Sequence, residues 1–322
     1  MNRRRRLERP EVVARAHTAW HQLHPEGPEP AAIEVLVRKK KSAVCRLHGP
    51  VETGFPVIAK RARTRSAQVE RALHARILPR LPVGTLDWYG MVDEEQDDFC
   101  WLFLEDAGDA AFAPERHEHR VLAATWLASL HTAGAGVESA PPLRESGAPH
   151  VLERLRITRE RILANLGDAS LGQANRDDLD AILRLYDVIE RHWGECDALC
   201  AAIPRTLVHG DFAKKNLRVR ERDGVPELLV LDWEHAGVGF PGIDLFLADA
   251  SRYARAVREH WTGLDDGTLA GLFRIGRLFR CLAGIDWEAW CLGRPAGESR
   301  EVDFGRLASR LGCAVRESGW MR

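Results

Sequence analysis

The sequence predicts an α+β protein with a small, β-rich N-terminal lobe and a larger, mostly helical C-terminal lobe. Two observations support this class. Short runs rich in β-branched and aromatic residues crowd the first third of the chain, whereas a helical period dominates the rest. The length of 322 residues is also sufficient for two lobes and a sizeable core.

The N-terminal lobe is predicted to contain mainly strands. Five runs indicate strands, at residues 33–38, 43–49, 55–61, 85–92 and 99–105. One helix is expected near residues 10–23, before them. A second helix is expected in "SAQVERALHARILPRL", with Ser66 as its N-cap and Pro79 near its end.

The C-terminal lobe is predicted to be helical apart from a short β-like region at 206–232. Helical patterns occur at residues 119–134, 151–167, 175–200, 242–259, 267–294 and 302–317. The segment "EDAGDAAFAPE" (105–115) is rich in small residues and is the natural lobe boundary. We therefore expect an N-terminal lobe at 1–106 and a C-terminal lobe at 107–322.

Composition excludes several functional classes. The chain has 46 basic and 47 acidic side chains, a balance that disfavours non-specific nucleic-acid binding. No run approaches the roughly 18 apolar residues of a membrane span, and no apolar segment of a signal peptide follows the basic start. Seven scattered cysteines suit reduced thiols. We expect a cytoplasmic monomer or dimer with neither nucleic-acid nor membrane partners.

The segments "HGDFAKKN" (209–216) and "LLVLDWE" (228–234) combine the groups that phosphoryl transfer needs. Transfer of a γ-phosphoryl group needs a carboxylate to orient or deprotonate the attacking hydroxyl, and oxygen ligands for Mg²⁺. Asp211 is the candidate for the first role. Asn216 and Asp232 are the candidate metal ligands, and the apolar run before Asp232 predicts a buried strand that ends at the site.

These segments, followed by "GFPGIDL" (239–245), resemble the aminoglycoside phosphotransferase and choline kinase-like enzymes, which share the protein-kinase-like fold. The resemblance implies that Lys60 in "VIAK" binds the nucleotide phosphates and pairs with Glu70. It also implies that the backbones of Glu105 and Ala107 hold the adenine edge. His209 and Asp244 would support the catalytic loop.

The chain departs from the family pattern at two places. The segment "KKKSAVCRL" contains no glycine, so Lys41 and Ser42 would have to contact phosphate in place of a glycine-rich loop. Ala213 stands where relatives often have histidine, so Lys214 or Lys215 could supply positive charge instead. Only eleven residues separate Asp232 from Asp244, too few for the peptide-binding segment of a protein kinase.

The acceptor is the least specified part of the hypothesis. "IDWEAW" places Asp286 and Trp290 one helical turn apart, and a carboxylate beside an indole suits a cationic amine. Against this, Arg274, Arg277 and Arg280 recur every three residues and suit an acidic acceptor. A third interpretation is that the tryptophans pack between helices and the arginines face solvent.

The sequence thus indicates a phosphotransferase that uses ATP or GTP with Mg²⁺ and a small-molecule hydroxyl acceptor, with an aminoglycoside-like amine favoured by the family resemblance. The alternatives are a sugar, choline or amino-alcohol kinase, a protein kinase, and a non-catalytic nucleotide-binding module. The presence of Asp211, Asn216 and Asp232 together disfavours the last.

Overall fold

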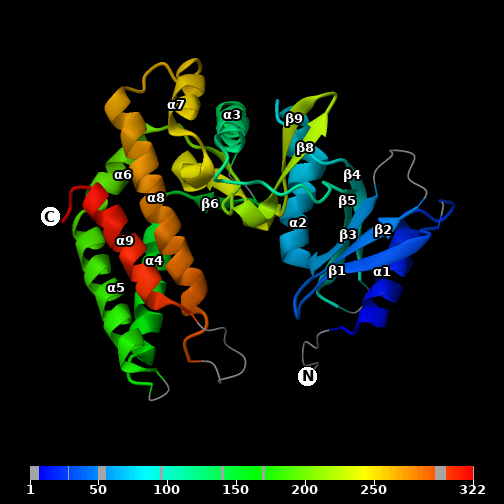
Figure 1. Cartoon of the computed structure of the whole chain (residues 1–322), viewed down its shortest axis with the longest axis horizontal. Coiled ribbons are helices and arrows are strands. Elements are labelled where there is room, and N and C mark those ends of the chain that lie inside the picture. The colour runs from blue at the N-terminus through cyan, green and yellow to red at the C-terminus, as the bar shows by residue number, and fades with distance from the viewer. Residues whose placement is uncertain are drawn as a thin grey trace. The chain divides into compact units, whose positions relative to one another are not determined.

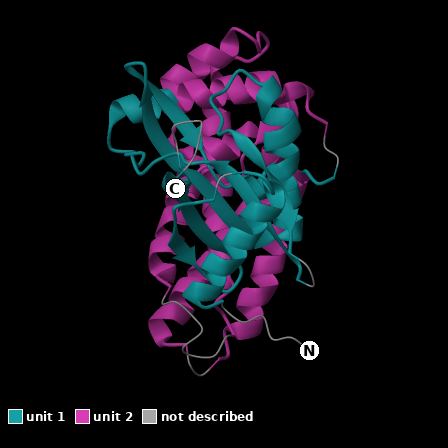
Figure 2. Cartoon of the chain, turned by 90° about the vertical axis from the view of Figure 1, so that its right-hand side faces the viewer, with its two compact units in different colours: residues 1–122, 140–143, 213–236 teal, residues 123–139, 144–212, 237–322 magenta. Residues whose placement is uncertain are grey.

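The chain forms two compact units in the computed structural model, which describes residues 7–27, 29–49, 56–94, 97–138, 141–168, 171–293 and 302–321. Unit 1 comprises residues 1–122, 140–143 and 213–236, and unit 2 comprises 123–139, 144–212 and 237–322 (Figure 2). Residues 213–236 therefore group with the N-terminal part of the chain. The lobe boundary expected at residue 106 stays a prediction.

Unit 1 contains an antiparallel sheet of five strands in the order β1-β2-β3-β5-β4. The strands are β1 (Ala32–Arg38), β2 (Ala43–His48), β3 (Val57–Arg63), β4 (Trp88–Asp93) and β5 (Phe99–Glu105). Their positions confirm the five predicted strands to within three residues at each end. The small antiparallel N-terminal sheet of the predicted fold class is thus present.

Two helices cover opposite faces of this sheet (Figure 1). On one face, Val12 and Ala16 of α1 (Arg9–Leu23) pack with alternate residues of the strands, such as Ala59 and Phe103. On the other face, Ala67 of α2 (Thr64–Ala72) packs with the residues between them. Because side chains alternate along a strand, Lys60 belongs to the α2 face.

The second predicted helix begins and ends differently from the expectation. It starts at Thr64, with Arg63 as N-cap and no side-chain cap, so Ser66 lies inside the helix and the prediction of its capping role is wrong. After Ala72 the coil widens into a π-helical turn, Leu73–Ile77, and then tightens into a 3₁₀ turn, Leu78–Arg80. Pro79 cannot donate a helical hydrogen bond, which explains the end.

Unit 1 is completed by a hairpin from much later in the chain. Strands β8 (Leu217–Arg222) and β9 (Val225–Val230) pair antiparallel through a two-residue turn. Both turn residues, Asp223 and Gly224, have positive φ, as the Asp-Gly sequence of a type I′ hairpin requires. The segment 206–232 is therefore not one β region, because its first strand lies in unit 2.

Unit 2 is mostly helical, as predicted for the C-terminal part. Helices α4, α5, α8 and α9 lie side by side (Figure 1), and their bounds are Ala148–Asn165, Gln173–Arg191, Asp266–Ala289 and Phe304–Glu317. The remaining helices are α3 (His117–Ala133), α6 (Trp193–Ala202) and α7 (Ala250–Arg258). The helix expected at 242–259 is instead a 3₁₀ segment, Pro241–Leu247, followed by α7, which is capped by Asp249.

A small sheet that was not predicted lies within unit 2. Its strand order is β6 (Arg144–Ser146), β10 (Gly237–Gly239) and β7 (Thr206–Val208), and each strand is only three residues long.

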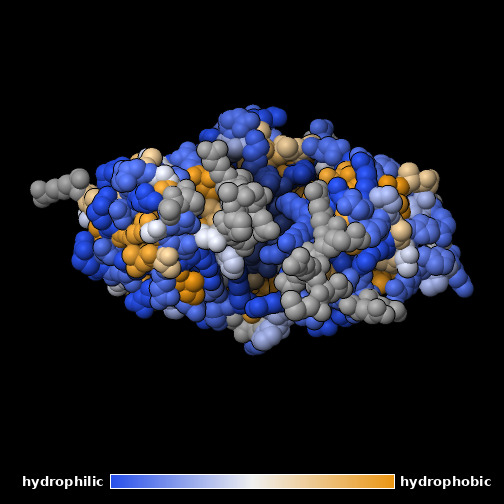
Figure 3. Space-filling model, turned by 90° about the horizontal axis from the view of Figure 1, so that it is seen from below, coloured by the Kyte–Doolittle hydropathy of each residue, from blue (hydrophilic) through white to orange (hydrophobic). Residues whose placement is uncertain are grey.

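On the face drawn in Figure 3, hydrophilic side chains surround separate apolar patches. None of the helices in the described parts of the chain is both long and apolar enough to cross a membrane.

Candidate active site

Lys60 is held between two carboxylates within unit 1. Its Nζ donates to Glu70 Oε1 at 2.6 Å and to Asp232 Oδ1 at 2.5 Å. β3 supplies the lysine, α2 supplies the glutamate, and the second residue after β9 supplies the aspartate. The structure therefore joins two residues that are 172 positions apart in the sequence.

Burial and mutual attraction shift the pKa values of this group. Burial raises the pKa of Glu70 to about 7, because its carboxylate is removed from water and the attraction of Lys60 offsets this only in part. Burial alone would lower the pKa of Lys60, but the attraction of Glu70 and Asp232 outweighs it and raises that pKa. The lysine is therefore a fixed cation.

Asn216 and Asp232 are brought together by the register of the hairpin. Leu217 pairs with Val230, and the Leu231 N–H donates to Asn216 O at 2.8 Å. The two candidate metal ligands consequently flank the same end of the hairpin. Asp232 has φ +65°, a left-handed conformation that few non-glycine residues adopt, aspartate and asparagine most readily, and that is enriched at functional sites.

This donor set suits a magnesium ion that also binds phosphate oxygens. An amide oxygen and one carboxylate are hard ligands, and Mg²⁺ in such sites usually completes its shell with water and phosphate. Among the described residues, no group of three or more His, Cys, Asp or Glu side chains could hold a metal ion by itself. A resident, fully protein-bound ion is therefore not indicated by the described part.

The end of β5 adjoins an apolar cluster. Leu86, Ala107 and Leu229 pack together, with Leu231 against them. The Glu105 N–H donates to Asp87 O at 2.9 Å, and its carboxylate pairs with Arg220. A planar nucleotide base can pack against apolar side chains while its edge bonds to backbone polar groups, and both kinds of group are present here. Sequence reasoning proposed Glu105 and Ala107 but missed the three leucines, whose proximity depends on the hairpin.

The β1–β2 connection is a tight turn rather than a long covering loop. The Lys39 N–H donates to Ser42 O at 2.8 Å, which closes the turn. Lys41 is exposed and Ser42 is half-buried. A phosphate-binding role of Lys41 and Ser42 stays a prediction.

Unit 2 holds the loop that follows β7. Asp244 accepts hydrogen bonds from the His209 N–H at 2.6 Å and from the Gly210 N–H at 3.0 Å. Gly210 has φ +77°, which favours glycine. The His209 ring accepts at Nδ1 from the Asp211 N–H at 3.2 Å. Buried Asp244 and His209 therefore fix the backbone on both sides of Asp211.

Asp211 is almost fully buried and contacts an arginine from α8. Its side chain is 2% exposed, and Arg280 Nη1 donates to Oδ1 at 3.2 Å. Sequence reasoning named Arg280 only as part of a basic stripe. The position of this stripe on the helix could not identify which member faces Asp211, since that depends on how α8 packs.

The residues proposed for the acceptor are engaged by arginines. Asp286 accepts from Arg154 Nε and Nη2 at 3.0 and 2.7 Å and from the Thr158 hydroxyl at 2.7 Å. Trp290 is exposed, with the Arg161 guanidinium 4.5 Å from its ring centroid. This geometry favours a structural role for Asp286, because its negative charge is already compensated. Amine binding by Asp286 and Trp290 stays a prediction.

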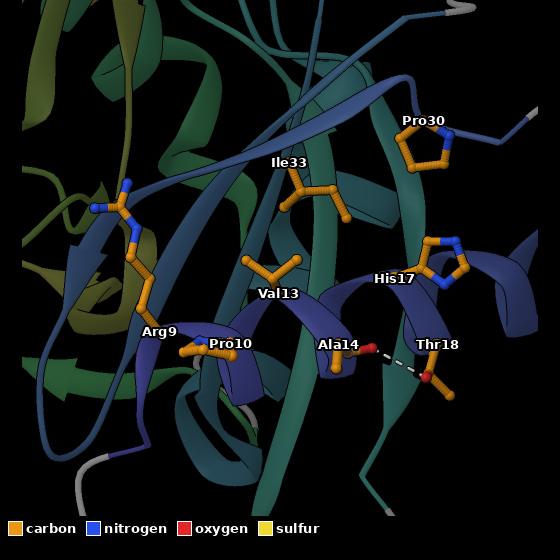
Figure 4. Close-up of a pocket in the computed structure, with 8 residues that line it drawn as sticks. All are labelled: Arg9, Pro10, Val13, Ala14, His17, Thr18, Pro30 and Ile33. Atoms are coloured by element: carbon orange, nitrogen blue, oxygen red, sulfur yellow. Dashed lines mark hydrogen bonds between the residues drawn. The ribbon is translucent and has the colours of Figure 1, made fainter.

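A groove of unit 1 lies away from these residues. It runs between α1 and β1 and is lined by Val13, His17, Pro30 and Ile33, among others (Figure 4). None of the residues predicted from the sequence lines it. The groove therefore adds nothing to the candidate site.

Solved structures establish the fold. A macrolide 2′-phosphotransferase from Brachybacterium faecium is 17% identical, with a TM-score of 0.58. The match covers 96% of this chain and 98% of the macrolide phosphotransferase. An ethanolamine kinase from Plasmodium vivax is 14% identical, with coverage of 98% and 91% and a TM-score of 0.61. An aminoglycoside 2′-phosphotransferase in complex with GDP is 13% identical, with coverage of 96% and 99% and a TM-score of 0.62.

These likenesses confirm the two-lobed protein-kinase-like fold that the sequence resemblance implied. No curated protein matches the chain. The model of the phosphotransferase enzyme family matches residues 51–290, which is well over half of the sequence. The chain therefore belongs to the phosphotransferase enzyme family and is a small-molecule kinase of that family.

Proposed function

We propose that this protein transfers the γ-phosphoryl group of ATP or GTP to the hydroxyl of a small molecule, with Mg²⁺ as cofactor. The observation that supports this best is the position of Lys60 between Glu70 and Asp232. A lysine whose pKa is raised remains a cation that can bind phosphate oxygens, and the buried glutamate orients it.

Each functional group has a distinct part in the proposed reaction. Lys60 binds nucleotide phosphate, and the leucines beside Ala107 contact the base. Asn216 and Asp232 would hold magnesium, which neutralises charge on the phosphate oxygens when bound. Asp211 orients the acceptor hydroxyl and accepts its proton as the oxygen attacks phosphorus. His209 and Asp244 keep the Asp211 backbone in place.

The test is Asp211→Asn, which preserves shape but removes the base. Since general-base catalysis contributes roughly 10²–10⁴-fold, kcat for phosphoryl transfer should fall by about that factor. The dissociation constant of the Mg²⁺–nucleotide complex, measured by calorimetry, should change little. A matched control is Asp223→Asn in the β8–β9 turn, where asparagine tolerates positive φ. Retention of most turnover by Asp211→Asn would reject this role.

The nucleotide preference and the acceptor belong to the proposal as well. The structurally similar proteins include one solved with GDP and kanamycin and others described as aminopropanol and choline kinases. An amine-bearing acceptor, such as an aminoglycoside, is therefore one candidate. The compensated charge of Asp286 does not favour it.

A further inference from the structure

Arg280 contacts Asp211, the candidate general base, and has further N–H donors for another ligand. A guanidinium carries five N–H donors in a planar fork, and the bond from Nη1 to Asp211 Oδ1 uses one of them. The Arg280 side chain is 23% exposed, whereas the Asp211 side chain is 2% exposed. The arginine therefore connects the buried carboxylate with solvent.

Two arginines of the basic stripe, Arg277 and Arg280, have different environments. Arg277, one turn before Arg280 on α8, pairs with Glu317 of α9 at 2.7 Å and is half-exposed. Arg280 alone of these two contacts Asp211. Arg277 is therefore a matched control for Arg280, because it has the same side chain on the same helix, three residues away.

The surroundings of Arg280 leave room and provide an aromatic surface. Its guanidinium carbon lies 4.9 Å from the ring centroid of Trp287, two turns further along α8, and that ring is 38% exposed. Between them, a Cβ added at Gly284 would meet no atom within 4 Å. By contrast, a Cβ at Gly276 would lie 2.1 Å from Gly242 O. The space beside Gly284, between Arg280 and Trp287, is therefore open.

Two arginines face one carboxylate in this part of unit 2. Arg154 and Arg161 both lie within 4 Å of the Asp286 carboxylate, so two cations face one anion there. Arg280 and Asp211 balance each other. Glu288 is displaced by about 80° around α8 from Arg280, toward the side of Arg277. Of the two carboxylates on this part of α8, Asp286 is therefore compensated and Glu288 lies off the Arg280 side of the helix.

We propose that Arg280, with Trp287 and the open space at Gly284, recognises an acceptor that bears an anionic group as well as its hydroxyl. The anion binds the guanidinium, Trp287 keeps that plane in position, and the hydroxyl meets Asp211. A carboxylate and a phosphate share the required chemistry. This inference rests on the proposed function, because it assigns Asp211 as the base.

The test compares four three-carbon alcohols that differ in one substituent: glycerate, glycerol 3-phosphate, glycerol and 3-amino-1,2-propanediol. With the full chain, Mg²⁺ and nucleotide, kcat/KM should be highest for an anionic alcohol and lowest for the amine. The ratio between the two anionic compounds distinguishes carboxylate from phosphate. A hydrogen bond to a charged group is worth about 1.5–3 kcal/mol, so Arg280→Gln should raise KM for the preferred anion roughly 10- to 100-fold.

Three variants separate recognition from structure. Arg277→Gln removes the same charge elsewhere on α8 and should leave the KM of every alcohol unchanged. Arg280→Lys should recover part of the anionic preference. Gly284→Leu should raise acceptor KM while the nucleotide KM stays constant, because it fills the open space. If Arg280→Gln lowers kcat equally for all four alcohols, Arg280 only positions Asp211 and the inference is wrong.

Failure of the inference can be told from failure of the proposed function. Mg²⁺-dependent nucleotide binding and slow nucleotide hydrolysis without acceptor depend on Lys60 and need no knowledge of the acceptor. If both persist while the amine is preferred, or while neither anionic alcohol is phosphorylated, the anionic acceptor is rejected alone. If both are absent, the phosphotransferase assignment itself fails.

Discussion

Lys60 shows how a buried charge depends on its partners. Glu70 has no exposed side-chain surface, so loss of Lys60 would leave its carboxylate buried beside Asp232 without a counterion. Removing one partner of a buried pair typically costs about 3–5 kcal/mol, whereas replacing both by apolar groups is often nearly neutral. The pair as a whole therefore adds little net stability, although each partner depends on the other.

We expect Lys60→Met to lower the free energy of unfolding by roughly 3 kcal/mol. The double variant Lys60→Met/Glu70→Leu should recover at least half of that loss, because the fully buried Glu70 carboxylate is then gone and only the partly exposed Asp232 lacks its lysine. Urea denaturation of the wild type, both single variants and the double variant closes the cycle. Additive losses would show that the two side chains are not energetically coupled.

At the scale of elements, α8 approaches the 3₁₀ segment Pro241–Leu247 so closely that only glycine fits at the contact. A Cβ at Gly276 would lie 2.1 Å from Gly242 O and 2.6 Å from its carbonyl carbon, and both are backbone atoms that cannot rotate away. Asp244, which accepts hydrogen bonds from the His209 and Gly210 N–H groups, follows two residues after Gly242. Packing of α8 and the position of Asp244 are therefore linked.

Gly276→Ala should consequently destabilise the protein by about 1–3 kcal/mol, the usual cost of overpacking. It should also lower kcat, because a shift of residue 242 moves Asp244. Gly284→Ala on the same helix is the matched control, since its added methyl group meets nothing and alanine favours helix by up to about 1 kcal/mol. Thermal denaturation compares the two. Equal stability of both variants would contradict the tight contact.

The start of α3 is predicted to respond to pH. His119 accepts at Nδ1 from the Ala113 N–H at 2.9 Å, and burial together with Arg116 lowers the pKa of His119 below its usual 6.5. The unfolded chain therefore binds a proton more readily, so stability is present above pH 6.5 and is lost as pH falls through it. His119→Asn keeps an acceptor but does not titrate.

Between about pH 7.5 and 5.5, the wild type should lose more of its free energy of unfolding than His119→Asn. Urea titrations at several pH values measure the difference. Parallel pH curves for the two proteins would mean that protonation of His119 does not weaken this segment.

The elements that could be predicted are those whose sequence pattern is local. Strands β2, β3 and β5 alternate or concentrate apolar residues over six or seven positions, and their predicted bounds were close. The three-residue strands β6 and β10 are too short for a pattern and exist because they pair with each other and with β7. The cap expected at Ser66 was wrong because Thr64 already continues from β3 into the helix.

At the scale of the whole molecule, the same distinction applies to the candidate site. Asp211, Asn216 and Asp232 were recognisable from their spacing and their family resemblance. Arg280 at Asp211 and Arg154 at Asp286 bridge 69 and 132 positions of sequence, so no local signal could pair them. The Asp286 carboxylate is an example, since it looks available in the sequence but is paired with Arg154 in the fold.

Nucleotide binding should stabilise the whole chain only with magnesium. A ligand at 100 times its dissociation constant adds about 2.7 kcal/mol, which corresponds to a rise in Tm of roughly 5 °C. Asp232→Ala should abolish the magnesium-dependent part of this rise, whereas Asn216→Ala should reduce it less, because a neutral amide contributes less to a hard cation. Scanning calorimetry with nucleotide, with and without EDTA, measures it. Equal magnesium dependence in wild type and Asp232→Ala would contradict the assignment.

The composition of unit 1 has a consequence for biosynthesis. The unit combines residues 1–122 with 213–236, so its final hairpin is translated only after residues 123–139 and 144–212 of unit 2. Until then the nascent unit lacks the β8–β9 hairpin and the aspartate that pairs with Lys60. Domains usually fold in the order of their synthesis. In this chain unit 1 becomes complete only at residue 236, when segments 123–139 and 144–212 of unit 2 are already part of the nascent chain, so unit 2 begins before unit 1 ends.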